Sequence, residues 1–370
     1  MVRYQFSRKL NKEFAATLRQ RVNGYFKDKD LSRNANTEMV TKTIFGIGVY
    51  TACYLVAMLS GSSNLILQFA LWASMGFFMA FIGLTIMHDS LHGSYSRKKS
   101  INNLVGLSSV IIGASDIVWK IQHNVLHHTY TNIEDADEDI MPRFVMRFSP
   151  NQPKYWFHRF QHIYCWFFYA TNTIIWTTIK DFIKLGQYKK QGLVKPKEFP
   201  KYLVNMIFRK ALYNTVFLVL PLLFLPLPTG QIMLLWLTMH VVAGITLALV
   251  FQTAHITPTS EFYVVEDGHV EENFYAHQLY TTANYSTKSK TISWLVGGLN
   301  FQVEHHLFPT VCHVHYPAIS KIVKETAEEY NLPYYDIPTF WGAVGAHYRM
   351  LRHLGRAEVQ PRQYRSKVAA

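Results

Sequence analysis

Three groups of closely spaced histidines are the residues of this sequence most able to do chemistry. In the segment NFQVEHHLFP, His305 and His306 follow Gln302 by three and four residues. On a helix these spacings place Gln302 on one face with both rings, while the two rings diverge by about 100°. Adjacent imidazoles that diverge can hold two metal ions, or one metal ion and a shared ligand. A pair of core residues has no need of that arrangement.

The other two groups are HDSLH, with His88 and His92, and HNVLHH, with His123, His127 and His128. A spacing of four residues predicts that both rings of the first group point the same way. In the second group the first two rings stack in the same manner, and His128 turns aside. Seven histidines in three such groups indicate one metal site assembled from distant parts of the chain. Imidazole suits zinc, copper, nickel and iron, so the ligand type alone does not choose the metal.

The other histidines carry less information. His255, in QTAHI at the end of a later apolar segment, is expected at the same depth as His88 and is a predicted eighth ligand. His240 lies in the middle of that segment, where a polar group normally hydrogen-bonds within a helix bundle. Two pairs give weaker signals: His158 and His162, which lie on an aromatic stretch and are set aside, and His313 and His315, which are expected to support the ligands or the fold.

The composition indicates a membrane protein with a substantial aqueous part. Of 370 residues, 49% are hydrophobic and only 16% are charged, whereas about 25% of the residues of a soluble domain are charged. The net charge of +13 is spread through the polar segments, which favours positive-inside loops and anionic lipid headgroups over a nucleic-acid partner. The three cysteines form no CxxC pair, so they predict neither a disulfide framework nor a zinc ribbon. The first residues lack the apolar core of a signal peptide.

Four apolar segments are long enough, at ~1.5 Å per residue, to cross a ~30 Å hydrocarbon core. They are residues 39–61, 65–87, 211–228 and 231–254. The short connections within the first and the second pair carry no Lys or Arg, so each pair is predicted to form a hairpin. The N-terminus and the long polar segments, rich in Lys and Arg, are then expected on the cytoplasmic side.

Two further apolar stretches are not predicted to span the membrane. Residues 104–115 are too few to cross and are expected to be re-entrant or interfacial. Residues 163–178 are near the lower limit, but a fifth crossing there would put NFQVEHH on the opposite side from HDSLH. With four crossings, all three histidine groups face the same side and can meet.

The polar remainder completes a single domain of residues 1–370. Residues 1–38 hold nine Lys or Arg against four Asp or Glu, with apolar residues every fourth position, which predicts a basic amphipathic helix. Such a helix lies either on the membrane surface or against its own domain. Residues 88–210 and 255–370 are predicted to form a cytoplasmic helical cap. The predicted fold is therefore all-α: an integral membrane protein of four transmembrane helices in two hairpins, with a cap that carries the histidines.

The motifs HxxxH, HxxxHH and QxxHH, with hydrophobic hairpins between them, resemble those of the membrane fatty acyl desaturases. Gln302 stands in place of a histidine, and in this the motif resembles that of the front-end desaturases. These enzymes place the double bond by its distance from the carboxyl end of the acyl chain. TTANYS at 281–286 and WLVGGLNFQ at 294–302 resemble that group too. The resemblance covers roughly residues 40–320.

The resemblance implies two non-haem iron ions held by the seven histidines of the three groups. His255 matches a further ligand position of the family, and Gln302 stands at another, where it would bind weakly, through water, or not at all. The neighbouring residues Asp89, Asn124 and Glu304 are candidates to orient the ligand rings. The implied reaction is the O2-dependent insertion of a cis double bond near the carboxyl end of a lipid-bound or thioester-bound acyl chain, as in delta-5, delta-6 or linoleoyl-CoA desaturases.

Several expectations follow for substrate and partners. The acyl chain should occupy an apolar tunnel, for which Trp72, Phe77, Trp119 and Trp294 are candidate wall residues. The His-Pro-Gly-Gly motif of a fused cytochrome b5 domain is absent, which predicts an external electron donor, either a ferredoxin or a cytochrome of the b5 type.

Further expectations concern the charged residues and the location of the protein. The basic residues Arg349, Arg352 and Arg356 could steer an acidic donor. The acidic run Glu134–Asp139 is expected to be a solvated loop. A bacterial inner membrane is the predicted location.

Three other functions remain open at this point. A sphingolipid desaturase or a fatty acid hydroxylase of the same superfamily would use the same ligands. A non-enzymatic metal carrier, from another class, would place histidines along a path through the spans, whereas only His240 lies inside one.

Overall fold

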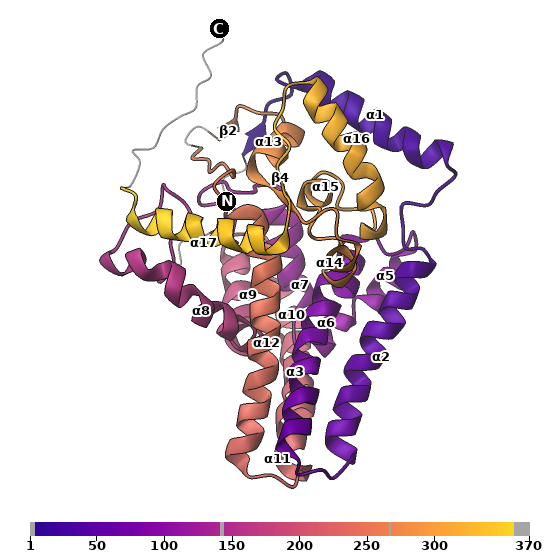
Figure 1. The fold of residues 1–370 in the computed structure, drawn as a ribbon, viewed down its shortest axis with the longest axis vertical. Coiled ribbons are helices and arrows are strands. Elements are labelled where there is room, and N and C mark those ends of the chain that lie inside the picture. The colour runs from indigo at the N-terminus through magenta and orange to yellow at the C-terminus, as the bar shows by residue number, and fades with distance from the viewer. Residues whose placement is uncertain (1–3, 141–143, 266–267, 359–370) are drawn as a thin grey trace.

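Four long apolar helices stand together at one end of the molecule, and smaller helices cover their other end (Figure 1). The computed structural model describes residues 4–140, 144–265 and 268–358. Each of the four helices is long and apolar enough to cross a membrane, which confirms the predicted fold class. They run over Thr37–Leu59, Leu65–His92, Phe199–Phe224 and Thr229–His255.

Local signals set the ends of the first two spans. The first is α2 (Thr37–Leu59), whose N-terminus is capped by the side chain of Asn36. The second begins with α3 (Leu65–Phe81), where the side-chain oxygen of Asn64 accepts hydrogen bonds from two backbone N–H groups of the first turn. It continues without a break through η1 (Ile82–Met87), a π-helical stretch, into α4 (His88–His92).

The third span overlaps the predicted one but begins and ends earlier. Instead of residues 211–228, the helix consists of α10 (Phe199–Asn214), η5 (Thr215–Val219) and α11 (Leu220–Phe224). The predicted span began just after Lys210, whose Nζ lies 2.9 Å from a carboxylate oxygen of Asp181 in the structure. That pairing allows the helix to begin earlier, so residues 199–210 do not belong to the cap. Leu225 is extended because a proline follows it.

The fourth span is α12 (Thr229–His255), close to its predicted bounds. It packs against α3 and against α8 (Gln161–Ile175). No candidate span includes α8, in agreement with the prediction for residues 163–178. The stretch predicted to be re-entrant is part of a helix pair, Lys99–Ile111 and Asp116–His127, that bends by 108°.

The remaining elements build the cap and its edges. Helices near the first two histidine groups are α5 (Lys99–Val105), α6 (Ser108–Ile111), α7 (Asp116–Trp119) and η2 (Lys120–His127). Beside and behind them lie η3 (Trp156–Phe160), η4 (Trp176–Lys180) and α9 (Asp181–Lys190). The later cap helices are α13 (Phe274–Thr281), α14 (Lys290–Leu295), α15 (Gln302–Leu307), η6 (His313–His315), α16 (Tyr316–Glu329) and α17 (Phe340–Arg356).

Strands are few and short among the described residues. β1 (Gln5–Phe6) pairs in parallel with β2 (His269–Val270), and β3 (Asn284–Tyr285) pairs in parallel with β4 (Asp336–Ile337). These two pairs tie the beginning and the end of the chain to the segments around the third histidine group.

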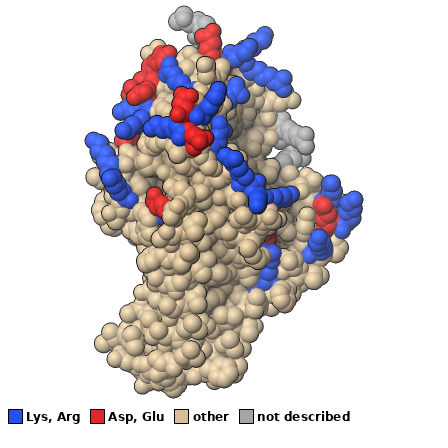
Figure 2. All heavy atoms as spheres, turned by 90° about the vertical axis from the view of Figure 1, so that its right-hand side faces the viewer, with Lys and Arg blue, Asp and Glu red and all other residues tan. Residues whose placement is uncertain are grey.

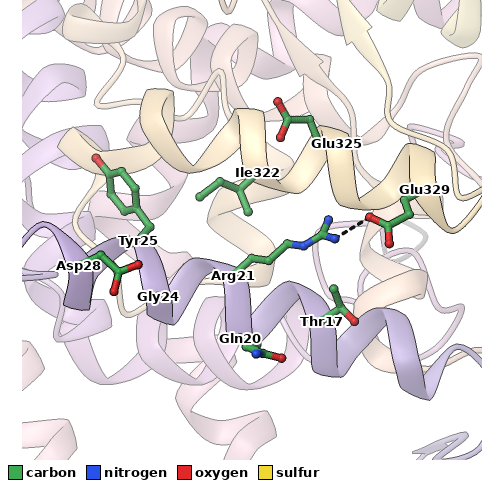
Figure 3. Close-up of a pocket in the computed structure, with 9 residues that line it drawn as sticks. All are labelled: Thr17, Gln20, Arg21, Gly24, Tyr25, Asp28, Ile322, Glu325 and Glu329. Atoms are coloured by element: carbon green, nitrogen blue, oxygen red, sulfur yellow. Dashed lines mark hydrogen bonds and ion pairs between the residues drawn. The ribbon is translucent and has the colours of Figure 1, made fainter.

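The N-terminal helix α1 (Lys12–Asp28) packs on the cap, against α16 and α13. Its buried residues Phe14, Leu18 and Val22 join one hydrophobic cluster with residues of α15 and α16. Arg21 reaches across to α16, where its guanidinium lies 2.6 Å from a carboxylate oxygen of Glu329 (Figure 3). Of the two interpretations of residues 1–38, the structure favours packing against the chain's own domain.

Charged side chains gather at the cap end of the molecule. On the face shown in Figure 2, Lys, Arg, Asp and Glu cover the cap and the band below it, while the free ends of the membrane helices show none. This face of the molecule is thus divided along the long axis into a charged end and an apolar end, as expected for a protein that stands in a bilayer.

Candidate metal centre

Eight imidazoles meet where the second and fourth spans enter the cap. They come from α4, η2 and the residue after it, the last residue of α12, and α15. The ring nitrogens form three overlapping groups, and within each group the candidate ligand atoms lie within 4.8 Å of one another. The groups are His88, His92, His123 and His305; His127, His255 and His306; and His128, His305 and His306. The structure therefore brings together all eight histidines predicted as ligands.

The third histidine group divides its two rings between two positions, as its spacing predicted. The planes of His305 and His306 are inclined by 82°. His305 joins the group that we call position A (His88, His92, His123, His305), and His306 joins position B (His127, His255, His306). Position A offers four ring nitrogens and the neighbouring position B offers three. This arrangement suits two metal ions better than a single ion.

Unpartnered nitrogens indicate that these rings fit a metal. Among the described residues, six of the eight rings have a buried Nε2 atom without a hydrogen-bond partner: His88, His92, His127, His255, His305 and His306. In the other two, Nε2 of His128 lies 3.2 Å from Nε2 of His123. A buried polar atom left without a partner costs free energy. Six such nitrogens in one cluster therefore indicate a bound metal that would accept their lone pairs.

The π-helical form of η2 explains why His128 also faces the centre. The backbone N–H of His128 donates to the carbonyl of His123, five residues earlier. This wider turn aligns residues five apart as well as residues four apart. The prediction that His128 turns aside is therefore wrong, because it assumed α-helical geometry.

Gln302 lies in the same buried region, at position B. Its side chain is completely buried, and both its amide oxygen and its amide nitrogen lack partners among the described residues. It is close enough to His255 to influence the protonation of that ring. The amide therefore stands where a fourth ligand, or a water held by the amide, would complete position B.

In three of the rings, the nitrogen that faces away from the centre is held by residues that the sequence did not reveal. Nδ1 of His127 lies 3.1 Å from both carboxylate oxygens of Asp137. Nδ1 of His305 lies 3.1 Å from the hydroxyl of Tyr316. Nδ1 of His306 lies 2.9 Å from the side-chain oxygen of Gln278. Such contacts fix the ring orientation and leave Nε2 for a metal.

The acidic run Glu134–Asp139 is not a solvated loop, contrary to the prediction. Asp137 is completely buried, and its carboxylate also accepts hydrogen bonds from the backbone N–H groups of Asn132 and Asp139. Glu138 is buried as well and lies 3.0 Å from Nζ of Lys184. The run was predicted to be solvated because acidic residues normally are, whereas here a histidine and a lysine neutralise it.

Of the three residues predicted to orient the rings, one faces a ring. An oxygen of Asp89 lies 3.7 Å from Nδ1 of His88. Asn124 instead donates to the carbonyl of Leu91. Glu304 accepts hydrogen bonds from the side chains of Asn284 and Tyr334. The last two predicted roles are wrong because helix geometry turns a residue adjacent to a ligand away from the ligand's own direction.

Burial disfavours protonation of the two rings of the third histidine group. It lowers the pKa of His305 and His306 well below the usual value, and neighbouring imidazoles lower it further. His127 is the exception: burial lowers its pKa, but Asp137 and Asp139 outweigh burial and raise it. Neutral imidazole is the form that binds metal, and a carboxylate behind one ring increases the basicity of that ligand.

Glu304→Gln is expected to leave metal binding intact and to change the pH dependence of stability. Burial raises the pKa of Glu304 from its usual 4.5 to about 8. Because the folded pKa exceeds the unfolded one, the wild type loses stability as the pH rises through this interval, and the amide does not. In thermal unfolding of the metal-free protein in detergent, the unfolding temperature of the variant should therefore rise relative to that of the wild type from about pH 5 to about pH 8. If this variant lost its metal, Glu304 would orient a ligand ring after all, as the sequence predicted.

An apolar cavity of about 330 Å³ reaches position A. Its wall includes the rings of His88 and His123, together with Trp119, whose ring centroid lies 4.4 Å from that of His123. Of the predicted tunnel residues only Trp119 lines this cavity. The other three pack elsewhere: Trp72 is completely buried in the helix bundle, and Phe77 and Trp294 contact phenylalanine rings.

The remaining predictions concern residues outside the centre. His240 hydrogen-bonds within the bundle as predicted, with Nδ1 3.1 Å from the hydroxyl of Thr173. His158 and His162 belong to none of the metal groups found among the described residues. His315 contacts the backbone of Asn34. The hollow between α1 and α16 (Figure 3) is lined by none of the predicted ligands and is a surface feature of the cap.

Comparison with known proteins agrees with this geometry. A model of the fatty acid desaturase family matches residues 64–338. An acyl-lipid (8-3)-desaturase of Physcomitrium patens is 38% identical over 94% of this chain and 73% of its own length. Two proteins named sn-1 linoleoyl-lipid 6-desaturase are similar along nearly their whole length. The one from Arthrospira platensis is 32% identical over 92% of both chains, and the one from Synechocystis is 31% identical over 96% of this chain and 98% of its own. This chain, with its three histidine groups gathered at one end of four membrane helices, belongs to the fatty acid desaturase family.

Proposed function

We propose that this desaturase uses two irons and O2 to introduce a cis double bond near the carboxyl end of an acyl chain carried by a membrane lipid. The single observation that supports this most is the apolar cavity whose wall includes two ligand rings of position A. The relatives named acyl-lipid and linoleoyl-lipid desaturases support the lipid carrier and the front-end position.

The proposed ligands are the seven histidines of the three groups together with His255, and Gln302 completes position B directly or through water. The irons, when bound, supply the O2-derived oxidant that removes two hydrogens from an unactivated methylene pair. With two electrons and two protons from outside, both oxygen atoms leave as water.

The contribution of this chain to the reaction is to position the acyl chain and to exclude solvent. His88 and His123 lie in the wall of the cavity, so the carbons that react are those that the cavity holds against position A. Seven of the eight ligand histidines are buried, and His92 is partly buried. The Nδ1 contacts of His127, His305 and His306 keep these three rings fixed while the acyl chain enters and leaves.

An exposed apolar helix face borders the cavity, which favours a lipid-linked acyl chain over a soluble thioester. Ile175 of α8 lines the cavity and is 45% exposed. Along the same helix the outward residues Ile163 and Phe167 are apolar and exposed, and Ile179 continues this face. A continuous apolar face of this kind is expected to lie against acyl chains of the bilayer, so a substrate can move sideways from the membrane into the cavity.

Filling the cavity should separate binding of the acyl chain from assembly of the metal centre. Ala248 of α12 lines the cavity and is 8% exposed. Ala248→Phe is expected to lower product from C18 and C20 chains at least tenfold, because added side-chain volume competes with acyl carbons. The metal content should stay unchanged. Leu234→Phe, at an exposed position of the same helix, is the matched control, and equal activities in the two variants would contradict this use of the cavity.

We also propose that the cap lies on the cytoplasmic side and receives electrons from an external acidic donor, a ferredoxin or a cytochrome of the b5 type. The charge distribution in Figure 2 supports this orientation, since basic residues favour the inner side. Arg349, Arg352 and Arg356 are exposed on α17 and suit an acidic partner. A bacterial inner membrane stays a prediction. Reporter fusions at residue 1 and in the connection at 60–64 test the orientation.

The decisive test is expression in a host that lacks polyunsaturated lipids, supplied with C18 and C20 acids. Mass spectrometry should locate a new cis double bond on the carboxyl side of an existing one, first in glycerolipids. New hydroxyl groups would identify a hydroxylase, and new double bonds only in sphingolipids would identify a sphingolipid desaturase. No new product in any lipid class, with folded protein and reductant confirmed, would contradict the proposed reaction.

A further inference from the structure

A buried lysine of the first membrane span is connected to the metal centre. Lys42 of α2 is 1% exposed, although its neighbours in that helix are largely apolar. Its Nζ lies 2.8 Å from Nε2 of His313 and 5.2 Å from the ring centroid of Trp294. A buried cation in a membrane helix costs free energy and usually marks a functional contact.

The hydrogen bonds along this connection have a defined direction. A lysine ammonium only donates, so Nε2 of His313 accepts and Nδ1 carries the proton. Nδ1 then donates to an oxygen of Asp89 at 2.8 Å. The same oxygen accepts from Sγ of Cys312 at 3.0 Å and from the backbone N–H of His313 at 3.3 Å.

The other oxygen of Asp89 faces the metal centre. It lies 3.7 Å from Nδ1 of His88, and Nε2 of His88 points into position A without a partner. The connection thus runs from Lys42 through His313 and Asp89 to a ligand ring. It joins α2, which carries none of the predicted ligands, to the first histidine group and to the segment that follows the third group.

We infer that Lys42 and His313 are positioning residues: by holding the carboxylate of Asp89 against Nδ1 of His88, they set the metal affinity of position A. This inference rests on the proposed metal centre. Without the lysine, the buried carboxylate loses the cation that faces it through His313 and is free to turn from the ring. If the lysine had only a structural role, its loss would lower the stability of the fold and leave the metal affinity of both positions unchanged.

The test uses the full-length metal-free protein in detergent and follows binding of Co²⁺ by its visible absorption. The wild type is expected to bind two equivalents. Lys42→Met should weaken one of the two binding steps by about 10-fold to 100-fold, the effect usual for removing support from a ligand, and should alter the Co²⁺ spectrum of that step. The other step should stay as in the wild type.

Lys210→Met is the matched control. Lys210 is also a buried lysine of a membrane span, 5% exposed, but it is bound to Asp181 and touches no ligand ring. This variant should lose stability and keep both Co²⁺ affinities. If Lys42→Met is recovered unfolded, His313→Phe removes the middle of the connection and carries the same expectation.

Two results would overturn separate claims. Two unchanged Co²⁺ affinities in Lys42→Met or His313→Phe, with stability lowered as in Lys210→Met, would show a structural role only and leave the proposed function intact. Failure of the wild type to bind Co²⁺ at all would contradict the proposed metal centre itself.

Discussion

His305→Ala is expected to reduce double-bond formation below detection and to remove bound metal from both positions. The ring of His305 belongs to two of the ligand groups, one shared with His88 and one shared with His306. Its ring centroid lies 4.5 Å from those of His88 and His128. Loss of this ring therefore opens position A and removes a contact beside position B. Product analysis and metal content of the purified protein are the two measurements.

A control must show that metal is not lost simply because a buried histidine has been replaced. His347 is equally buried and is hydrogen-bonded to the hydroxyl of Tyr169 and the carbonyl of Ile256, away from the ligand groups. His347→Gln is expected to lower thermal stability and to keep its metal. If His305→Ala retained as much metal as this control, His305 would not be a ligand.

Asp137→Asn should have the second largest effect although Asp137 is not a predicted ligand. Both carboxylate oxygens face Nδ1 of His127, and the same oxygens accept two backbone hydrogen bonds. An amide replaces one acceptor by a donor and removes the negative charge behind the ring. We expect metal affinity at position B and the rate of product formation to fall by about 10-fold to 100-fold.

Glu138→Gln is the matched control for this acidic run. Glu138 is buried beside Asp137 but contacts Tyr188 and Lys184 instead of a ligand ring. It should affect stability more than metal binding. Equal metal affinities in the two variants would show that the run only balances charge and does not serve His127.

The sequence was sufficient for the features that depend on local spacing. The four apolar segments, the three histidine groups and the division of His305 and His306 between two positions follow from residue type and helix periodicity. The placement of His255 beside the groups followed from its position at the end of a span. These properties need no knowledge of tertiary contacts.

The features that the sequence could not predict depend on contacts between distant segments. The π-helical turn that aims His128 at the centre has no composition signal of its own. Asp137 belonged to what looked like a solvated acidic loop, and the predicted third span stopped short of Lys210, which pairs with Asp181 in the structure. In each case a charged or irregular residue is explained by a partner far along the chain, which single-sequence periodicity does not show.

The central claim is that eight imidazoles and one amide hold two irons beneath the cap. The most direct measurement is metal analysis combined with Mössbauer spectroscopy of protein purified in detergent from cells grown with isotope-enriched iron. The predicted result is two irons per chain with the spectrum of a magnetically coupled pair. A protein that holds a single zinc ion per chain in a closed site, and takes up no iron after the zinc is removed, would contradict the claim.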